Sequence, residues 1–425
     1  MLAWISVKAH TDLSGLVLFI LVLAAVACGA DEPRGSSATP VPAASSAATV
    51  GSPTKPTPPL SGLNPVVSAG SDQVAANLRA VIDRTCETVD ADLQIAGGIH
   101  IVELATCSVQ TLTSEVGDVE PRYSPDGRHL AFVRWDALGA DSSTSDIYVL
   151  DLATGGLFNL TSTPAEIESR IQWSPDSSSI AYVSSSPSER QDWSREDLRV
   201  VELDPPGARR IVIPDWGCSS YEWSPDAARV LAYLCGDTFG SPMKLVDLTN
   251  LSTSILADNY SAYGAYWSPD GRAVTYNCVA IYSEPTPTGP SGEPLYTPNR
   301  DTCVVLVDTV TLVRLDRSEA PHWLPDGSGL SYSTPRGLVI YKIDGTKEQP
   351  SLLQSDVTWI TERFATYSIC PFSVTDCFGE MRLLDTESAR ETSLISNACS
   401  PAWSPDHSRI VFSNNGSPVR LACFD

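Results

Sequence analysis

A short segment is repeated along the chain from residue 123 onwards, and it constrains the fold more than any other feature. Each copy has an aromatic residue, one further residue that is usually Ser, and then Pro-Asp, often followed by Gly. The first five copies begin 44 to 56 residues apart, and the sixth follows after 80 residues. A fixed period of about 40 to 50 residues indicates a repeat architecture. The copies begin at Tyr123, Trp173, Trp223, Trp267, Trp323 and Trp403.

Each copy lies between two short apolar runs, such as residues 129–133 and 273–276 on the downstream side. Pro presets φ for the second position of a type I turn, Asp suits such turns, and Gly is favoured where they close. A second pair of runs with a turn of its own follows, most clearly at residues 146–152 and 157–161. The alternation predicts strands. One repeat is therefore a four-stranded antiparallel meander, with the turn aromatic packed on the next sheet.

This pattern resembles the TolB-like, or WD40-like (PD40), β-propeller repeats. Their hallmark is the same turn, followed by an I-A-F/Y strand and an I-Y-V-x-D-L strand, and the resemblance covers residues 98–425. It implies an all-β propeller of four-stranded antiparallel blades. The family is functionally mixed, so the resemblance implies little about activity.

The two ends of the repeat region complete each other. Residues 99–104 and 108–113 have the character of a second strand pair whose first pair is missing, and residues 399–413 supply one last hairpin. We therefore expect a ring closed by strands from both termini. The segment 420–424 competes with residues 99–104 for one strand position.

A degraded repeat fills the interval of 80 residues. Trp359 replaces the turn aromatic, residues 360–362 replace the Pro-Asp turn, and residues 363–367 form the second strand. This repeat predicts seven blades. Six is the alternative, if residues 355–378 are irregular.

The N-terminal region has the features of an export signal. Residues 13–27 are an apolar run, shorter than the roughly 20 residues of a comfortable membrane span. The tetrad that ends at Cys28 resembles a bacterial lipobox, although Ala25 departs from the preferred Leu. We expect a signal peptide over residues 1–28, with lipidation of Cys28. An uncleaved anchor and free secretion are the alternatives, and all three place the protein in the cell envelope outside the cytoplasm.

Two further segments precede the repeats. Residues 29–65 are rich in Pro, Ala, Ser and Thr and predict a disordered tether. Residues 66–97 are a lead-in with a short helix that Ser71 caps.

Eleven Cys residues leave ten once Cys28 is assigned to lipid. An even number of Cys in an exported chain favours disulfides over metal or thiol chemistry. The spacing predicts local pairs, which are Cys86–Cys107, Cys218–Cys235, Cys278–Cys303, Cys370–Cys377 and Cys399–Cys423.

The chain is strongly acidic, with 28 basic and 51 acidic residues and a formal net charge of −23. Such a chain repels a phosphate backbone, so we expect no nucleic-acid partner. We expect a soluble, monomeric folded region.

The sequence contains no recognisable catalytic motif. The five His residues have no partner at metal-ligand spacing, and His129 and His407 are expected on the surface. No nucleophile elbow, phosphate loop or His-Glu-x-x-His motif occurs. TolB-like propellers also occur fused to serine peptidase domains, but the chain ends with the ring, so we expect no autonomous peptidase. We predict no catalytic, cofactor or metal site and a non-enzymatic protein.

Binding is expected on the face opposite the Pro-Asp turns, because that face carries the long loops. Trp135, Trp193 and Tyr296 are the candidates there for contact with a protein, peptide or glycan. The alternative is a propeller enzyme, a lyase, cyclotransferase or hydrolase, with its site at the central channel.

Overall fold

A computed structural model describes residues 71–82 and most of residues 95–421. Its larger gaps lie at 137–143, 188–195, 236–241, 280–299, 349–356 and 370–378. The expected signal peptide, Cys28 and the tether lie outside the described residues. In the part that is described, no helix is long and apolar enough to cross a membrane.

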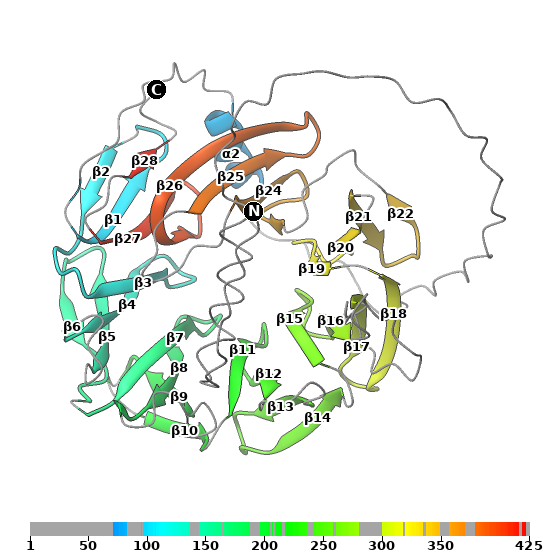
Figure 1. Cartoon of the computed structure of the whole chain (residues 1–425), viewed down its shortest axis with the longest axis horizontal. Coiled ribbons are helices and arrows are strands. Elements are labelled where there is room, and N and C mark those ends of the chain that lie inside the picture. The colour runs from blue at the N-terminus through cyan, green and yellow to red at the C-terminus, as the bar shows by residue number, and fades with distance from the viewer. Residues whose placement is uncertain are drawn as a thin grey trace, which may run out of the picture. The chain divides into compact units, whose positions relative to one another are not determined.

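The strands form antiparallel sheets that follow one another around a ring (Figure 1). Five sheets have four strands each, and the first strand of each sheet is at the inner edge of the ring. The first sheet contains β3 (Asp118–Tyr123), β4 (His129–Trp135), β5 (Ser145–Asp151) and β6 (Leu157–Asn159). The second sheet contains β7 (Ile167–Trp173), β8 (Ser179–Ser185), β9 (Asp197–Glu202) and β10 (Arg209–Ile213). The third sheet contains β11 (Cys218–Trp223), β12 (Arg229–Cys235), β13 (Met243–Asp247) and β14 (Thr253–Ala257). The fourth sheet contains β15 (Ser261–Trp267), β16 (Ala273–Val279), β17 (Arg300–Leu306) and β18 (Thr311–Arg317). The fifth contains β19 (Glu319–Trp323), β20 (Gly329–Thr334), β21 (Gly337–Lys342) and β22 (Lys347–Glu348).

The other strands form one continuous eight-stranded sheet. Its strand β26 is 14 residues long, and it pairs with β25 along its first part and with β27 along its last part. Because β26 joins the last two repeats into one sheet, the number of blades stays a prediction. The strands are β1 (Gly98–Glu103), β2 (Ser108–Thr111), β23 (Thr358–Trp359), β24 (Phe364–Ile369), β25 (Gly379–Asp385), β26 (Arg390–Trp403), β27 (Arg409–Asn414) and β28 (Arg420–Leu421).

The ring is closed by strands from both ends of the repeat region, as the sequence predicts. Strand β1 pairs antiparallel with β27, so that His100 lies opposite Phe412 and Glu103 lies opposite Arg409. Strand β28 pairs with β26 instead, with Leu421 opposite Ile395. It therefore does not compete with β1 for a position in the sheet.

The Pro-Asp turns are held by a set of hydrogen bonds that recurs around the ring. In the first turn, the Ser124 hydroxyl donates to Asp126 Oδ1 (2.6 Å) and accepts the His129 N–H (2.9 Å), while Asp126 Oδ1 accepts the Arg128 N–H (3.0 Å). Asp126 thus helps to close the turn, as the sequence predicts. Equivalent bonds form in the turns that begin at Ser174, Ser224, Ser268 and Ser404.

The degraded repeat closes its turn with different groups. The Thr361 hydroxyl accepts the Phe364 N–H (3.0 Å), and the Ile360 N–H donates to the Phe364 carbonyl (2.9 Å). The Thr361 hydroxyl thus takes the place of the Ser hydroxyl, which accepts the corresponding N–H in the Pro-Asp turns. The aromatic position is kept, because Trp359 is buried against the fifth sheet.

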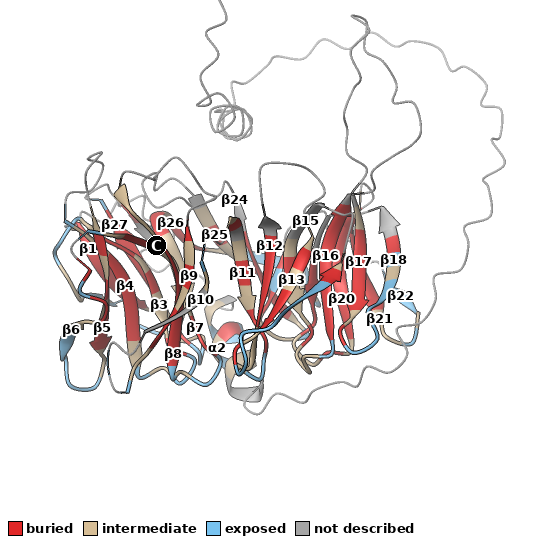
Figure 2. Cartoon of the chain, turned by 90° about the horizontal axis from the view of Figure 1, so that it is seen from below, coloured by how far each residue is buried: buried red, intermediate tan, exposed pale blue. Residues whose placement is uncertain are grey.

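Hydrophobic clusters lie between successive sheets, and the buried residues are concentrated along the middle of the strands (Figure 2). Trp223 packs with Val183 and Leu198. These two residues belong to the preceding sheet, so the expectation that the turn aromatic packs on the next sheet is wrong. The reason lies in the indole, since Trp223 Nε1 donates to a carbonyl of that preceding sheet (3.4 Å).

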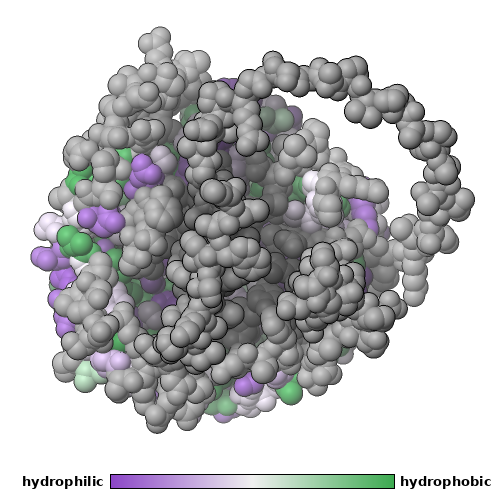
Figure 3. Space-filling model, viewed as in Figure 1, coloured by the Kyte–Doolittle hydropathy of each residue, from purple (hydrophilic) through white to green (hydrophobic). Residues whose placement is uncertain are grey.

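Helix α2 (Ser71–Ile82) covers part of the eight-stranded sheet. Leu78 is fully buried in a cluster with Phe364 and Phe412, and Val74 packs against the same cluster. The helix thus contributes its apolar face to the core at the point of ring closure. On the face drawn in Figure 3, hydrophilic and hydrophobic described residues are interspersed around the rim.

A disulfide joins Cys278 to Cys303, across β16 and β17. Cys218 and Cys399 are also disulfide-bonded, and the backbone register places Cys218 opposite Cys235. The side chains of the other candidates, Cys86, Cys107, Cys235, Cys370, Cys377 and Cys423, lie outside the described residues.

Candidate functional site

A row of polar and aromatic residues lies at the inner edge of the ring. Each one directly precedes the turn aromatic on the innermost strand of its sheet. We call this set the inner row; its members on the five four-stranded sheets are Arg122, Gln172, Glu222, Tyr266 and His322. Each of β3, β7, β15 and β19 has an irregularity in its pairing just before this position. Such bulges re-aim the side chains that follow them.

The inner row brings neighbouring sheets into contact. The Gln172 side chain donates to the Tyr221 carbonyl (2.9 Å), and the Tyr221 hydroxyl donates to the Ala181 carbonyl (2.9 Å). Trp173 Nε1 in turn donates to the Arg122 carbonyl (3.1 Å). Residues about 50 positions apart in the sequence are thereby fixed relative to one another.

Glu222 has the most perturbed carboxyl group of this row. Burial raises the pKa of Glu222 to about 8, and hydrogen bonds from Gln172 and Tyr233 offset only part of that effect. The residue as a whole is half-buried. Protein thus surrounds the carboxyl group. At neutral pH it is mostly protonated and can donate a proton.

Arg122 supplies a positive charge in the same row. Burial lowers the pKa of the Arg122 guanidinium, and the nearby Glu120 opposes that shift. An Arg remains protonated at neutral pH even so. Among the described residues, no group of three or more His, Cys, Asp or Glu side chains could hold a metal ion.

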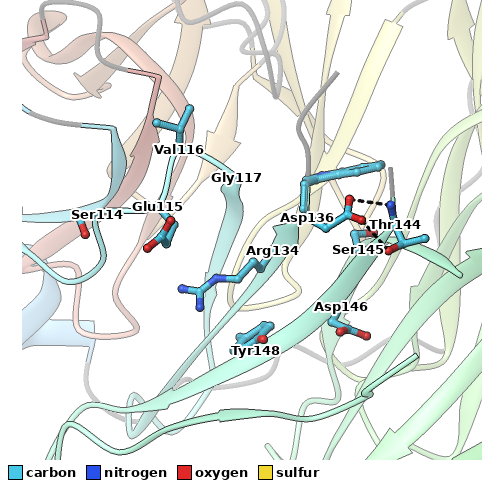
Figure 4. Close-up of a pocket in the computed structure, with 11 residues that line it drawn as sticks. Ser114, Glu115, Val116, Gly117, Arg134, Asp136, Thr144, Ser145, Asp146 and Tyr148 are labelled. Atoms are coloured by element: carbon cyan, nitrogen blue, oxygen red, sulfur yellow. Dashed lines mark hydrogen bonds between the residues drawn. The ribbon is translucent and has the colours of Figure 1, made fainter. Parts of the chain in front are cut away.

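A separate pocket of about 650 Å³ opens at the ends of β4 and β5, on the face opposite the Pro-Asp turns (Figure 4). Arg134 and Tyr148 lie next to each other in this pocket, and Asp136 binds Thr144 at its rim through hydrogen bonds of 2.8 and 3.2 Å. The lining residues are Ser114, Glu115, Val116, Gly117, Arg134, Trp135, Asp136, Thr144, Ser145, Asp146 and Tyr148.

Arg134 is held in place from two sides. Its Nε and Nη2 atoms donate to the two carboxylate oxygens of buried Asp118, at 2.5 and 2.8 Å. The guanidinium carbon lies 4.4 Å from the centre of the Tyr148 ring, a cation–π contact. These hydrogen bonds to Asp118 raise the pKa of Arg134. The pocket therefore has a rigid wall.

The structure places the residues that the sequence singled out as follows. Trp135 lines the pocket of Figure 4, whereas Trp193 and Tyr296 lie outside the described residues. The expectation that His129 and His407 lie on the surface is wrong. Both are partly buried, because their rings pack against Trp173 and Trp403 respectively.

The inner row was missed by the sequence analysis. One signal could have found it: the residue before the turn aromatic changes type from repeat to repeat, while the turn segment that follows it is nearly constant. A search for local catalytic motifs cannot detect a site that takes one residue from each repeat.

The comparison with protein-family models finds no match. The chain is 30% identical to "Uncharacterized peptidase YuxL" of Bacillus subtilis over a segment of 122 residues. This segment is 28% of this chain and 18% of that protein. The chain thus spans under a fifth of the length of this relative.

Solved structures are similar to the chain at low sequence identity. An oligogalacturonate lyase from Vibrio parahaemolyticus has a TM-score of 0.53 at 14% identity, over 78% of this chain and 97% of that chain. A putative TolB from Agrobacterium tumefaciens has a TM-score of 0.41 at 18% identity, over 77% of this chain and 98% of that chain. The antiparallel sheets arranged in a ring form a β-propeller, and the similarity to the oligogalacturonate lyase structure supports this fold.

These names correct one prediction. The expectation of a non-enzymatic protein is contradicted, because the similar proteins include one named as a peptidase and one named as a lyase. The prediction rested on the absence of a recognised catalytic motif, and this absence does not exclude a site whose residues come from separate repeats.

Proposed function

We propose that this protein is a hydrolase that acts on a peptide or glycan chain at the inner edge of the propeller. The observation that supports this most is the environment of Glu222. Its carboxyl group has a pKa of about 8, and the residue is half-buried on an innermost strand. Perturbed carboxyl groups of this kind are typical of catalytic acids.

The proposed chemistry is proton transfer. The protonated Glu222 donates its proton to the leaving oxygen or nitrogen atom as the bond to it breaks. The resulting carboxylate then takes a proton from the attacking water, whose oxygen is retained in the other product, and Glu222 returns to its acid form. Gln172 orients the carboxyl group, and Arg122 stabilises negative charge on the substrate.

The choice of substrates follows the similar proteins. One relative is named as a peptidase and one structural neighbour as an oligogalacturonate lyase, so both peptide and glycan substrates are tested. The lyase reaction is the alternative outcome of the same screen. It would produce an unsaturated sugar product without the uptake of water.

Glu222→Gln tests this proposal directly. General acid–base catalysis contributes roughly 10²- to 10⁴-fold to a rate, so kcat on chromogenic peptides or glycosides should fall by that factor. In the native protein, kcat should fall as the pH rises through about 8, where the acid form of Glu222 is lost. Glu348→Gln, on the exposed outer strand β22, is the matched control. Equal rates in the three proteins would disprove the role of Glu222.

A second candidate function is the binding of a protein, peptide or glycan on the face with the pocket of Figure 4. The pocket there, with its fixed Arg134 and with Trp135 in its lining, favours this function. Trp135→Ala should abolish crosslinking of a defined partner in cells. Arg128→Ala, in an exposed Pro-Asp turn on the opposite face, should preserve it. Loss of the partner in both variants, or in neither, would count against this face.

A further inference from the structure

The innermost strand of the third sheet differs from those of its neighbours. In β3, β7, β15 and β19 the pairing with the second strand of the sheet shifts by one residue shortly before the turn aromatic, as it does at a β-bulge. In β11 the register is continuous, from Cys218 opposite Cys235 to Trp223 opposite Val230. Among the innermost strands that the structure describes in the five four-stranded sheets, only β11, which carries Glu222, has a register without a shift (Figure 1).

Tyr221 occupies the place on β11 where the other innermost strands have their bulge. In three of those strands a left-handed residue marks the bulge, with φ of 55°, 55° and 56° at Glu120, Arg170 and Gly264. The residues that occupy the position of Tyr221 in the other four sheets are Pro121, Ile171, Ala265 and Pro321. The third sheet thus has a large aromatic side chain where the bulged strands have smaller residues.

The side chain of Tyr221 is anchored in the second sheet. The residue is 2% exposed, and its hydroxyl donates to the Ala181 carbonyl (2.9 Å) and also lies against the Arg170 carbonyl. Arg170 belongs to the bulge of β7 and has no opposite residue in the register of β7 with β8. The bulge of the second sheet thus offers a carbonyl to the Tyr of the third sheet.

Gln172 connects this anchor to the carboxyl group of Glu222. Its Nε2 atom donates to the Tyr221 carbonyl (2.9 Å), and its side chain also forms a hydrogen bond with Glu222. Trp223, which follows Glu222 in the chain, donates from Nε1 to the Gln172 carbonyl (3.4 Å). Both chain neighbours of Glu222 are therefore bound to the second sheet.

Tyr233 on β12 supplies the second hydrogen bond to the carboxyl group. It lies opposite Ser220, two residues before Glu222, so these three side chains share one face of the sheet. Tyr233 is 6% exposed and packs with Ala265 of the fourth sheet. The other charged or titratable groups near Tyr221 and Tyr233 are Glu120, Arg122, Arg170 and Tyr266.

We propose that Tyr221 is a positioning residue for Glu222. Its ring and hydroxyl fix β11 against the second sheet, and this contact holds the carboxyl group of Glu222 in its buried place. Without the hydroxyl, β11 can move away from the second sheet and water can reach the carboxyl group, which favours its charged form. The inference rests on the acid role proposed for Glu222 and adds the residue that maintains this role.

The test is a pH titration of the glutamate carboxyl carbons by NMR, in protein labelled with ¹³C-glutamate. The signal of Glu222 is identified by its absence from Glu222→Gln. Tyr221→Phe keeps the ring and removes the hydroxyl, and it should lower the pKa of Glu222 by about one pH unit because the carboxylate becomes better hydrated. Tyr233→Phe removes a hydrogen bond that favours the carboxylate, so it should raise the pKa instead.

Tyr367→Phe is the matched control. Tyr367 is 6% exposed, and its hydroxyl donates to Glu391 (2.8 Å) in the eight-stranded sheet. The control therefore also deletes a bonded hydroxyl from a buried ring, and it should leave the pKa of Glu222 unchanged.

The catalytic rate should follow the titration. At pH 8 the expected decrease in pKa reduces the acid form of Glu222 from about half of the molecules to about a tenth. The kcat of Tyr221→Phe at this pH, on a peptide or glycoside that the native protein cleaves, should thus be about fivefold lower. KM should stay the same, because Tyr221 is buried and does not touch the substrate.

An unchanged or raised pKa of Glu222 in Tyr221→Phe would overturn the positioning role, and so would an equal decrease in Tyr367→Phe. An ordinary pKa of Glu222 in the native protein would overturn both this role and the acid role. The titration needs no turnover. If Glu222→Gln leaves the activity unchanged, only the catalytic proposal fails, and the decrease in Tyr221→Phe still supports the positioning of the carboxyl group.

Discussion

Glu222 and Asp226 lie four positions apart, and their environments shift their pKa values in opposite directions. Burial raises the pKa of Asp226, but hydrogen bonds from Ser224 and from the Ala228 N–H outweigh it and lower the pKa. The same two kinds of effect act on Glu222, where burial dominates. The two pKa shifts differ because Asp226 is in an exposed turn, whereas Glu222 is on β11 at the inner edge of the ring.

The pH dependence of the free energy of unfolding should show whether the carboxyl group of Glu222 is buried. A carboxyl group with a folded pKa of about 8 and an ordinary value of 4.5 binds more protons in the folded state than in the unfolded state between these values. Its contribution to stability is thus fully present below pH 4.5 and is lost as the pH rises through 8. The loss is on the order of 5 kcal/mol at most.

Urea unfolding at pH 5, 7 and 9 measures this effect. The free energy of unfolding of Glu222→Gln, taken relative to the native protein, should increase with pH, because Gln does not ionise. A constant difference across the three pH values would show that Glu222 titrates normally.

At the scale of the element, the Pro-Asp hairpin is the unit that the chain repeats. The residue directly after the Asp has a positive φ in all six turns that contain the Pro-Asp pair. In three of these turns that residue is Gly. Ser177, Ala227 and His407 adopt this conformation without being Gly, with φ of 62°, 56° and 54°. The hydrogen bonds of the Ser-Pro-Asp turn are thus strong enough to impose a left-handed conformation on other residues.

Ala227→Gly should therefore stabilise the protein. The left-handed region costs a non-Gly residue about 1–2 kcal/mol, and the greater freedom of Gly in the unfolded chain cancels part of that gain. We expect a net increase of about 0.5–1 kcal/mol in the free energy of unfolding, measured with urea. Ala228→Gly is the control, because its φ is not positive, and it should destabilise by about 0.5–1 kcal/mol. A loss of stability in Ala227→Gly would contradict this account of the turn.

At the scale of the molecule, closure of the ring depends on a strand pair that is distant in sequence. Strand β1 pairs with β27, and the cluster beside it contains Ile99, Ile101, Phe132 and Val411. This cluster packs the first sheet against the closing strands. The last contacts of the ring thus require the chain to bring together segments about 300 residues apart.

A cavity at the closure should weaken the whole ring. Ile101→Ala removes a side chain that is 5% exposed and should lower the free energy of unfolding by about 2–4 kcal/mol. The unfolding curve followed by Trp fluorescence should keep a single transition at a lower midpoint. Gln110→Ala, at an exposed position on β2, should leave the midpoint unchanged. A second transition in Ile101→Ala would show that the sheets unfold separately.

The sequence alone determined the repeat, its turns and the closure of the ring. The Ser-Pro-Asp bonds span at most five residues, so their geometry follows from local chemistry. The closure of the ring followed from the two ends of the repeat region, because each end contains only part of a repeat and the two parts together make a whole one. Helix α2 followed from the spacing of apolar residues such as Val74 and Leu78.

The tertiary structure alone decided the candidate sites. Glu222 becomes a buried acid only because the packed sheets bury its carboxyl group, an effect that the hydrogen bonds from Gln172 and Tyr233 only partly offset. The pocket of Figure 4 forms only where residues 114–117 lie beside the ends of β4 and β5. Residue types and spacings do not predict such contacts, because the residues that meet are far apart in the sequence. A site built across repeats therefore depends on how the sheets pack around the ring, which a local motif cannot express.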